Sequence, residues 1–143
     1  IETAAKQADV YENIMEFPDR FETILGERGI TLSGGQKQRV SIARALAKNP
    51  KMLILDDCLS AVDTHTEHTI LENLKQVTKG KSSLIISHRV SSARLANRIF
   101  VLAEGKIVES GTHDELMKDQ TLYYELYQQQ LNEELQQVSA QSN

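Results

Sequence analysis

Residues 32–36 (Leu-Ser-Gly-Gly-Gln) have the types and order of an anion-binding turn. Gly34 and Gly35 let the backbone come close to a phosphate, and Ser33 adds a hydroxyl. Residues 36–47 have helical periodicity, so the start of that helix would supply unpaired N–H groups and a partial positive charge. The same residues would equally form an ordinary Ser-Gly-Gly turn that caps an amphipathic helix. These residues alone leave both interpretations open.

Two acids follow a run of apolar residues. Met52–Leu55 is continuously apolar and leads directly into Asp56 and Asp57. Such a run is typical of a parallel strand buried on both faces, and ligands bind beyond the carboxyl ends of such strands. Asp56 is suited to holding Mg²⁺ directly or through water, and Asp57 to orienting an attacking water. The alternative is a strand that ends in a solvated acidic turn.

A third candidate is His88, which follows the predicted strand 83–86. A histidine at the end of a buried strand is placed to donate a hydrogen bond to a phosphate oxygen. A single histidine is more often structural or simply exposed, so this residue is weak evidence by itself.

The elements that must position these residues alternate between helix and strand. This alternation predicts an α/β sheet with parallel strands at its centre. Two capping boxes and one serine cap mark helix starts, at Thr64 with Glu67, Thr112 with Glu115, and Ser91. The predicted helices are residues 2–15, 36–47 and 121–136, with further helices after Thr64 and Thr112 and a short one after Ser91. The predicted strands are 52–55, 83–86 and the hairpin pair 99–102 and 106–109.

Composition limits the class of protein. The 143 residues are 40% hydrophobic and 25% charged, which is typical of a globular domain. A formal net charge of −4 argues against a nucleic-acid binder that relies on a broad basic field. Cys58 is the only cysteine, so no internal disulfide forms. The apolar runs are far shorter than the ~20 residues that a membrane-spanning helix needs.

Taken in order, these segments closely resemble the nucleotide-binding domain of ABC transporters. The resemblance implies a P-loop NTPase-like α/β fold with a parallel central sheet flanked by helices. It also implies a partial helical subdomain in residues 1–35 and the C-terminal part of the ATPase core, with C-terminal helices, in residues 36–143. The matching segments are the signature motif at Leu32–Gln36, the Walker B strand at Leu53–Asp56, the D-loop at Ser60–Asp63, the switch histidine at His88 and the hairpin at Gly105–His113.

The resemblance implies ATP and Mg²⁺ as cofactors and gives each site residue a role. Asp56 would serve Mg²⁺, Asp57 would stand in for the general base, and His88 would contact the γ-phosphate. The signature motif would complete the ATP site of a second ABC ATPase domain. The residues that would reach the partner's ATP or couple the two sites are Ser33, Gly34, Gly35, Gln36 and Asp63.

Residues 23–29 resemble the segment with which exporters contact their transmembrane domains. Glu27 would then sense the coupling helix, although an ordinary exposed acid is the alternative. This segment favours an exporter subunit at the cytoplasmic face of the cell membrane, with no nucleic acid expected as a partner. Two alternatives remain: a soluble ABC ATPase that acts on nucleic acid or ribosomes, and a non-catalytic interaction piece.

The sequence departs from the family pattern in two places. No Gly-x-x-x-x-Gly-Lys-Ser/Thr loop occurs, and that loop cradles the phosphates. Ile1 is therefore expected to lie inside the helical subdomain of a longer protein. This segment alone is expected to bind ATP poorly or not at all and to expose apolar sheet edges.

The second departure is Asp57, where the family normally has a glutamate. The shorter aspartate would leave its carboxylate misplaced, and a misplacement near 1 Å costs about a hundredfold in rate. The resemblance then implies an impaired ATP site in one subunit of a heterodimeric exporter. The alternative is that Asp57 works after a small backbone shift.

Overall fold

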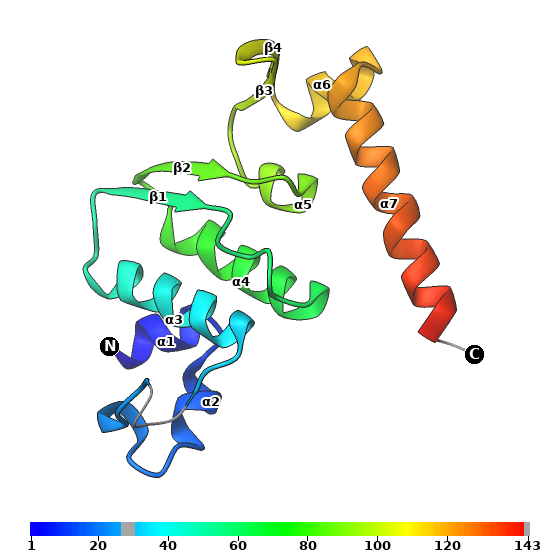
Figure 1. The fold of residues 1–143 in the computed structure, drawn as a ribbon. Coiled ribbons are helices and arrows are strands. Elements are labelled where there is room, and N and C mark those ends of the chain that lie inside the picture. The colour runs from blue at the N-terminus through cyan, green and yellow to red at the C-terminus, as the bar shows by residue number, and fades with distance from the viewer. Residues whose placement is uncertain (27–30, 142–143) are drawn as a thin grey trace. The chain divides into compact units, whose positions relative to one another are not determined.

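The computed structural model describes residues 1–26 and 31–141 and divides into two units, residues 1–86 and residues 87–143 (Figure 1). The predicted boundary between residues 35 and 36 concerns the subdomains of the family and not these two units, and it stays a prediction.

The first unit is mostly helical and contains one pair of strands. Its elements are α1 (Glu2–Gln7), α2 (Tyr11–Met15), the 3-10 helix η1 (Arg20–Glu22), α3 (Gly34–Ala47), β1 (Met52–Asp56), α4 (Thr64–Val77) and β2 (Ser82–Ile86).

The second unit combines a hairpin with three helices. Its elements are α5 (Val90–Ala93), β3 (Ile99–Ala103), β4 (Lys106–Gly111), α6 (His113–Asp119) and α7 (Leu122–Gln141). No helix in the described part of the chain has the length and hydrophobicity that crossing a bilayer requires.

β1 and β2 pair in parallel, in a register that runs from Met52 opposite Ser82 to Asp56 opposite Ile86. The parallel pairing confirms the prediction, and α4 lies along one face of the pair (Figure 1). A parallel pair needs such a crossover helix, because the chain must return to the same end of the sheet.

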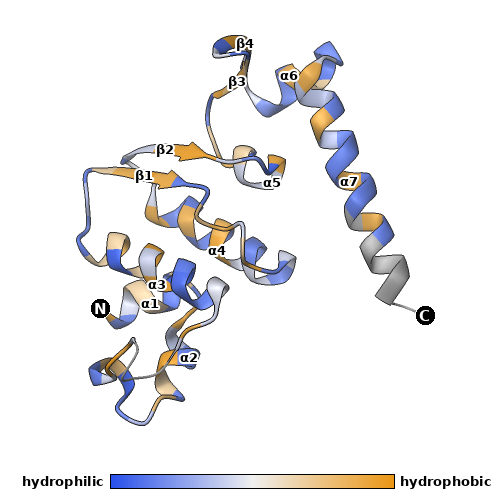
Figure 2. Cartoon of the chain, viewed as in Figure 1, coloured by the Kyte–Doolittle hydropathy of each residue, from blue (hydrophilic) through white to orange (hydrophobic). Residues whose placement is uncertain are grey.

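The prediction that both faces of β1 are covered is wrong. Leu53 and Leu55 are each 4% exposed, whereas Ile54 is 58% exposed. Side chains alternate between the faces of a strand, so burial on one face only produces this pattern. Figure 2 shows that both strands are hydrophobic along most of their length, so the uncovered face is apolar.

The predicted helix 2–15 is interrupted. Helix α1 ends at Gln7, and Asp9 adopts a left-handed φ of 52° before α2 begins at Tyr11. The guanidinium of Arg39 donates to the Asp9 carbonyl, and its Nη1 lies 3.7 Å from the Asp9 carboxylate. This tertiary contact from α3 stabilises a break that the local sequence does not reveal.

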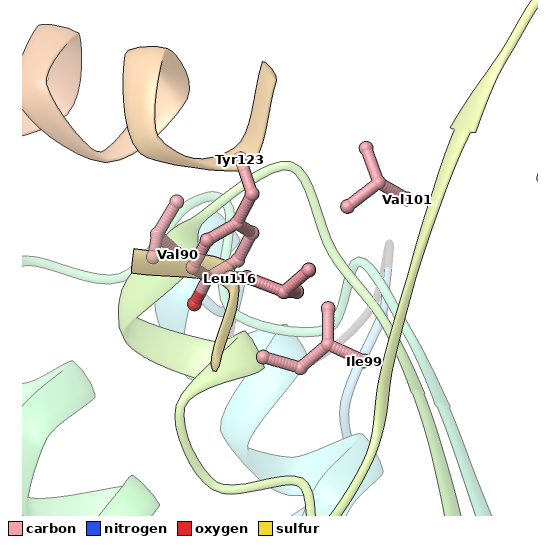
Figure 3. Close-up of a cluster of buried hydrophobic side chains, with 5 residues drawn as sticks. All are labelled: Val90, Ile99, Val101, Leu116 and Tyr123. Carbon is pink, nitrogen blue, oxygen red and sulfur yellow. The ribbon is translucent and has the colours of Figure 1, made fainter. Parts of the chain in front are cut away.

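A tight turn joins β3 and β4, as the sequence predicts. Glu104 and Gly105 at the tip both have positive φ, 50° and 71°, which matches the twist of a two-residue hairpin turn. The strands are antiparallel, with an irregularity between Val101 and Leu102. One face of the hairpin packs on α5, α6 and α7 in a buried cluster (Figure 3) of Val90, Ile99, Val101, Leu116 and Tyr123.

Three helix N-caps were predicted from the sequence, and one of them agrees with the structure. The capping box of Thr112 and Glu115 is confirmed, with both reciprocal bonds present. The other two caps were placed one or two residues too late. Asp63 caps α4 in place of Thr64, and Arg89 occupies the N-cap position of α5 in place of Ser91.

Candidate functional site

The first candidate residues lie at the exposed N-terminus of α3. This helix begins at Gly34, two residues earlier than predicted. Ser33 is the N-cap, and its Oγ accepts a hydrogen bond of 3.2 Å from the Gln36 backbone N–H. The Gln36 side chain accepts one of 2.9 Å from the Ser33 N–H. The capping interpretation of this turn is therefore correct. It does not exclude anion binding, because the Ser33 hydroxyl keeps its proton to donate.

The two glycines of this turn have different surroundings. A Cβ on Gly35 would lie 2.8 Å from the carbonyl oxygen of Ala61, which is closer than real side chains allow. A Cβ on Gly34 would meet only the Ala61 side chain, at an ordinary 3.5 Å. Gly35 is thus required by packing between α3 and the loop after β1, whereas the exposed Gly34 is not.

Gln38 joins the same helix to the same loop. Its Nε2 donates 2.9 Å to the Ser60 hydroxyl, and its Oε1 accepts 2.9 Å from the Ala61 N–H. The Asp57 carbonyl accepts from Ser60 Oγ at 3.2 Å and lies 3.5 Å from the Gln38 amide. The helix tip and the loop after the acid-ended strand therefore form one hydrogen-bonded assembly.

The two predicted catalytic acids lie where β1 ends. Asp56 is the last residue of the strand, shares the face of Ile54, and is exposed. Asp57 extends the parallel ladder, because its N–H donates 2.9 Å to the Ile86 carbonyl. The Asp57 backbone then turns at φ 43°, a left-handed conformation that aspartate tolerates better than most residues.

Asp63 ends the loop as the N-cap of α4. Its Oδ1 accepts a 3.0 Å bond from the Thr66 N–H. The hydrogen bonds from the backbone and side chain of Thr66 lower the pKa of Asp63, so it carries a negative charge at neutral pH. An anionic carboxylate is also favoured at a helix N-terminus.

Cys58 lies between the acids and the D-loop segment. Burial raises the pKa of its thiol, and the nearby charges of Asp57 and Asp56 add to the shift. The thiol is therefore protonated at neutral pH and is a poor nucleophile there.

His88 is exposed and belongs to the second unit. Gln130 of α7 holds the backbone on both sides of it: Gln130 Nε2 donates 2.7 Å to the His88 carbonyl, and Gln130 Oε1 accepts 2.8 Å from the Val90 N–H. The predicted meeting of His88 with the two acids stays a prediction. Glu27 lies outside the described residues.

The described residues contain no cluster of three or more His, Cys, Asp or Glu side chains that would hold a metal ion. Asp56 nevertheless fits a Mg²⁺ site of the common kind, because Mg²⁺ is usually bound by one or two carboxylates together with substrate phosphates and water.

Gln38 and Gln130 are two residues that the sequence did not indicate. Each makes hydrogen bonds with both ends of its side-chain amide to a segment at least 19 residues away in sequence. Glutamine within a helix is common, so no local signal distinguishes these two from the solvent-exposed ones.

Comparison with known proteins finds a family model and several proteins that this chain is similar to. Residues 2–60 match the family model described as ABC transporter. The chain is 48% identical over 126 residues to ATP-binding cassette sub-family B member 5 of Mus musculus, an alignment that covers 88% of this chain and 10% of that protein. It is 52% identical over 124 residues to an uncharacterised ABC transporter ATP-binding protein of Bacillus subtilis, an alignment that covers 87% of this chain and 21% of that protein.

The fold has a counterpart among solved structures. The structure of a bacterial Atm1-family ABC exporter with ATP bound superposes with a TM-score of 0.83 at 41% identity, covering 91% of this chain and 23% of that one. This likeness confirms the predicted P-loop NTPase-like α/β fold. The chain spans only a tenth to a fifth of the length of the two relatives named above.

Proposed function

Because the chain has the sequence and fold of an ABC transporter ATP-binding domain with relatives among exporters, we propose that it is part of the ATP-binding and ATP-hydrolysing subunit that powers export across a membrane. The exporter likeness covers most of the chain and favours transport over a soluble ATPase that acts on nucleic acid or ribosomes.

One observation carries this proposal: the exposed, serine-capped tip of α3 is bonded through Gln38 to the loop that follows the acid-ended strand. The tip offers the Ser33 hydroxyl and first-turn N–H groups to an anion. We assign Ser33, Gly34, Gly35 and Gln36 to the phosphates of ATP held by a second domain.

The residues at the end of β1 are assigned to this subunit's own site. Mg²⁺ would neutralise charge on the phosphates when bound, and Asp56 supplies a carboxylate for it at the sheet end. Asp57 stands in for the general base that orients the attacking water, and His88 donates a hydrogen bond to the γ-phosphate. Asp63 couples the two sites across the dimer.

The partner follows from the shared sites. Two such domains close face to face with nucleotide between them and separate after hydrolysis, which drives the transmembrane domains. The second domain is proposed to be non-identical, because Asp57 makes this site slow whereas the intact signature serves the partner's site. The segment around Glu27 contacts the transmembrane domains, so the subunit lies at the cytoplasmic face of the membrane. The 143-residue chain alone is expected to be inactive.

The test is ATP hydrolysis by the full-length subunit assembled with its partner. Asp57→Glu extends the carboxylate by one methylene and is expected to raise the rate of this subunit's site, by up to about a hundredfold. The matched control is Asp119→Glu, which makes the same change at an exposed position at the end of α6 and should leave the rate unchanged.

Two results would contradict the asymmetric arrangement: no increase with Asp57→Glu, or full activity of the subunit as a homodimer. Activity that requires nucleic acid or ribosomes instead of membrane domains would contradict the export function itself.

A further inference from the structure

We propose that Gln130 is a positioning residue that holds His88 in place for the γ-phosphate, so that helix α7 controls the switch histidine. The inference rests on the proposed role of His88. It is carried by the contacts of one side-chain amide within the second unit.

The Gln130 side-chain amide makes two hydrogen bonds to the backbone of residues 88–90. It donates 2.7 Å to the His88 carbonyl and accepts 2.8 Å from the Val90 N–H, across 42 and 40 residues of sequence. A third bond, of 2.9 Å, runs from the Arg89 N–H to the Ser87 hydroxyl. The backbone that carries the His88 side chain is therefore fixed on both sides.

The donor and the acceptor are both needed. Among side chains, only the amides of Asn and Gln present a donor and an acceptor side by side in one plane. Val90 opens α5, whose N-cap, Arg89, makes no side-chain capping bond. The Val90 N–H is one of the donors that a helix start leaves without an intrahelical partner, and Gln130 satisfies it from another helix.

Helix α7 is itself well anchored. The Glu109 carboxylate of β4 accepts from the N–H groups of Leu122 at 2.7 Å and Tyr123 at 3.2 Å, and so caps the start of α7. Tyr123 is 2% exposed and belongs to the same buried cluster as Val90 (Figure 3).

Gln130 follows Tyr123 by seven residues, about two helical turns, and so lies on the same face of α7. Val90 is thus held twice by α7, through its side chain by the cluster and through its N–H by Gln130. A shift of α7 along its axis would move the backbone of His88 with it.

The exposed His88 side chain takes its direction from this backbone. If α7 loses its hold, the imidazole is no longer directed at one point, and the contact that distinguishes ATP from ADP weakens. The effect should therefore appear in the preference for ATP over ADP, and it does not depend on whether the site hydrolyses ATP quickly.

The experiment measures the Kd of Mg-ATP and of Mg-ADP for the full-length subunit with its partner. His88→Ala is expected to lower the preference for ATP by about tenfold, the loss of one hydrogen bond to a charged group. Gln130→Leu removes both amide bonds and should lower the preference by a similar or somewhat smaller factor. Gln130→Glu keeps the acceptor but places a carboxylate against the His88 carbonyl, and should act in the same direction.

Gln129→Leu is the matched control. It changes the neighbouring residue, whose side-chain amide donates 3.1 Å to Glu133 one turn along the same helix, and should leave the preference unchanged. In a His88→Ala background, Gln130→Leu should have no further effect, because both changes remove the same contact. Hydrogen exchange at the Val90 amide should become faster in Gln130→Leu, which removes the acceptor of that N–H, and should stay slow in Gln130→Glu, which keeps an acceptor.

The outcomes distinguish a wrong role for Gln130 from a wrong role for His88. An unchanged preference in Gln130→Leu, alongside a loss in His88→Ala, overturns the inference and leaves the proposed function intact. An equal loss in the His88→Ala background also overturns it, since Gln130 would then act elsewhere. If His88→Ala itself has no effect, the proposed role of His88 is wrong, and the Val90 exchange rate alone decides whether Gln130 holds the loop.

Discussion

Gly34 and Gly35 are neighbours in one motif, yet only one of them has a backbone contact that excludes a side chain. We expect Gly35→Ala to lower the free energy of unfolding by about 1–3 kcal/mol, because its Cβ would press on the Ala61 carbonyl at 2.8 Å. Gly34→Ala should be neutral or raise the stability by up to about 1 kcal/mol, since alanine favours helix and its Cβ has room. Urea unfolding of the two variants measures the difference.

The comparison contains its own control, because the substitution is the same at adjacent positions. Equal destabilisation by both variants would contradict the packing role of Gly35. A loss of ATP-dependent activity in Gly34→Ala with unchanged stability would support the proposed approach of a phosphate to that glycine.

The position of Asp57 could be predicted from the sequence, but its backbone conformation could not. The pattern identifies the acid pair at the strand end, and the structure confirms that both residues lie there. The left-handed backbone at Asp57, φ 43°, could not be predicted, because it depends on the pairing with Ile86 and on the loop that follows. This conformation suits aspartate somewhat better than glutamate, so Asp57→Glu carries a small conformational cost that a stability measurement would separate from the gain in rate.

Elements whose signals are local were predicted well, and those that depend on distant contacts were not. The hairpin turn at Glu104 and the capping box at Thr112 are set by neighbouring residues, and both were correct. The break after α1 was missed because Arg39, 30 residues away, holds it.

Helix α6 meets α7 through a histidine whose environment predicts a pH dependence. His113 Nδ1 lies 2.9 Å from the Tyr123 hydroxyl, and its ring packs in a T-shaped arrangement with the rings of Tyr123 and Tyr127. Burial first, and then the charge of Arg94, lower the pKa of His113, against a smaller opposing effect of Asp114. Burial also raises the pKa of Tyr123, so its hydroxyl stays neutral beside the imidazole across this pH range.

The sign of the effect follows from linkage. Because the folded state holds His113 at a lowered pKa, the unfolded chain takes up a proton first as the pH falls. The stability of the second unit should therefore be highest above the ordinary histidine pKa, about 6.5, and fall as the pH drops through the folded value. Thermal unfolding between pH 7.5 and 5.5 measures this fall in stability. His113→Gln should make the melting temperature depend less on pH in this range, whereas the control His68→Gln, at an exposed position of α4, should not. An unchanged slope in His113→Gln would contradict this account.

At the scale of the whole molecule, the uncovered face of the parallel strands is the main feature. Four large apolar side chains on this face are roughly half exposed, and contiguous apolar surface of this kind marks a contact with another part of the protein or with a partner. Its members are Met52 at 56%, Ile54 at 58%, Leu84 at 47% and Ile86 at 47% exposure. The sequence predicts exposed apolar sheet edges, and the structure shows an exposed apolar sheet face.

The relatives are several times longer than this chain, and we expect that in the full-length subunit further residues of the ATPase core cover this face. Ile54→Lys should then have opposite effects in two contexts. In the 143-residue chain it should reduce aggregation and the binding of a hydrophobic dye, because it breaks up the patch. In the full-length subunit it should lower the free energy of unfolding by several kcal/mol, because it would bury an unpaired charge.

Gln76→Lys, at an exposed polar position of α4, is the control and should change neither the aggregation of the 143-residue chain nor the stability of the full-length subunit. If Ile54→Lys leaves the full-length subunit as stable as the parent, the face is not covered there, and the apolar run of β1 needs another partner.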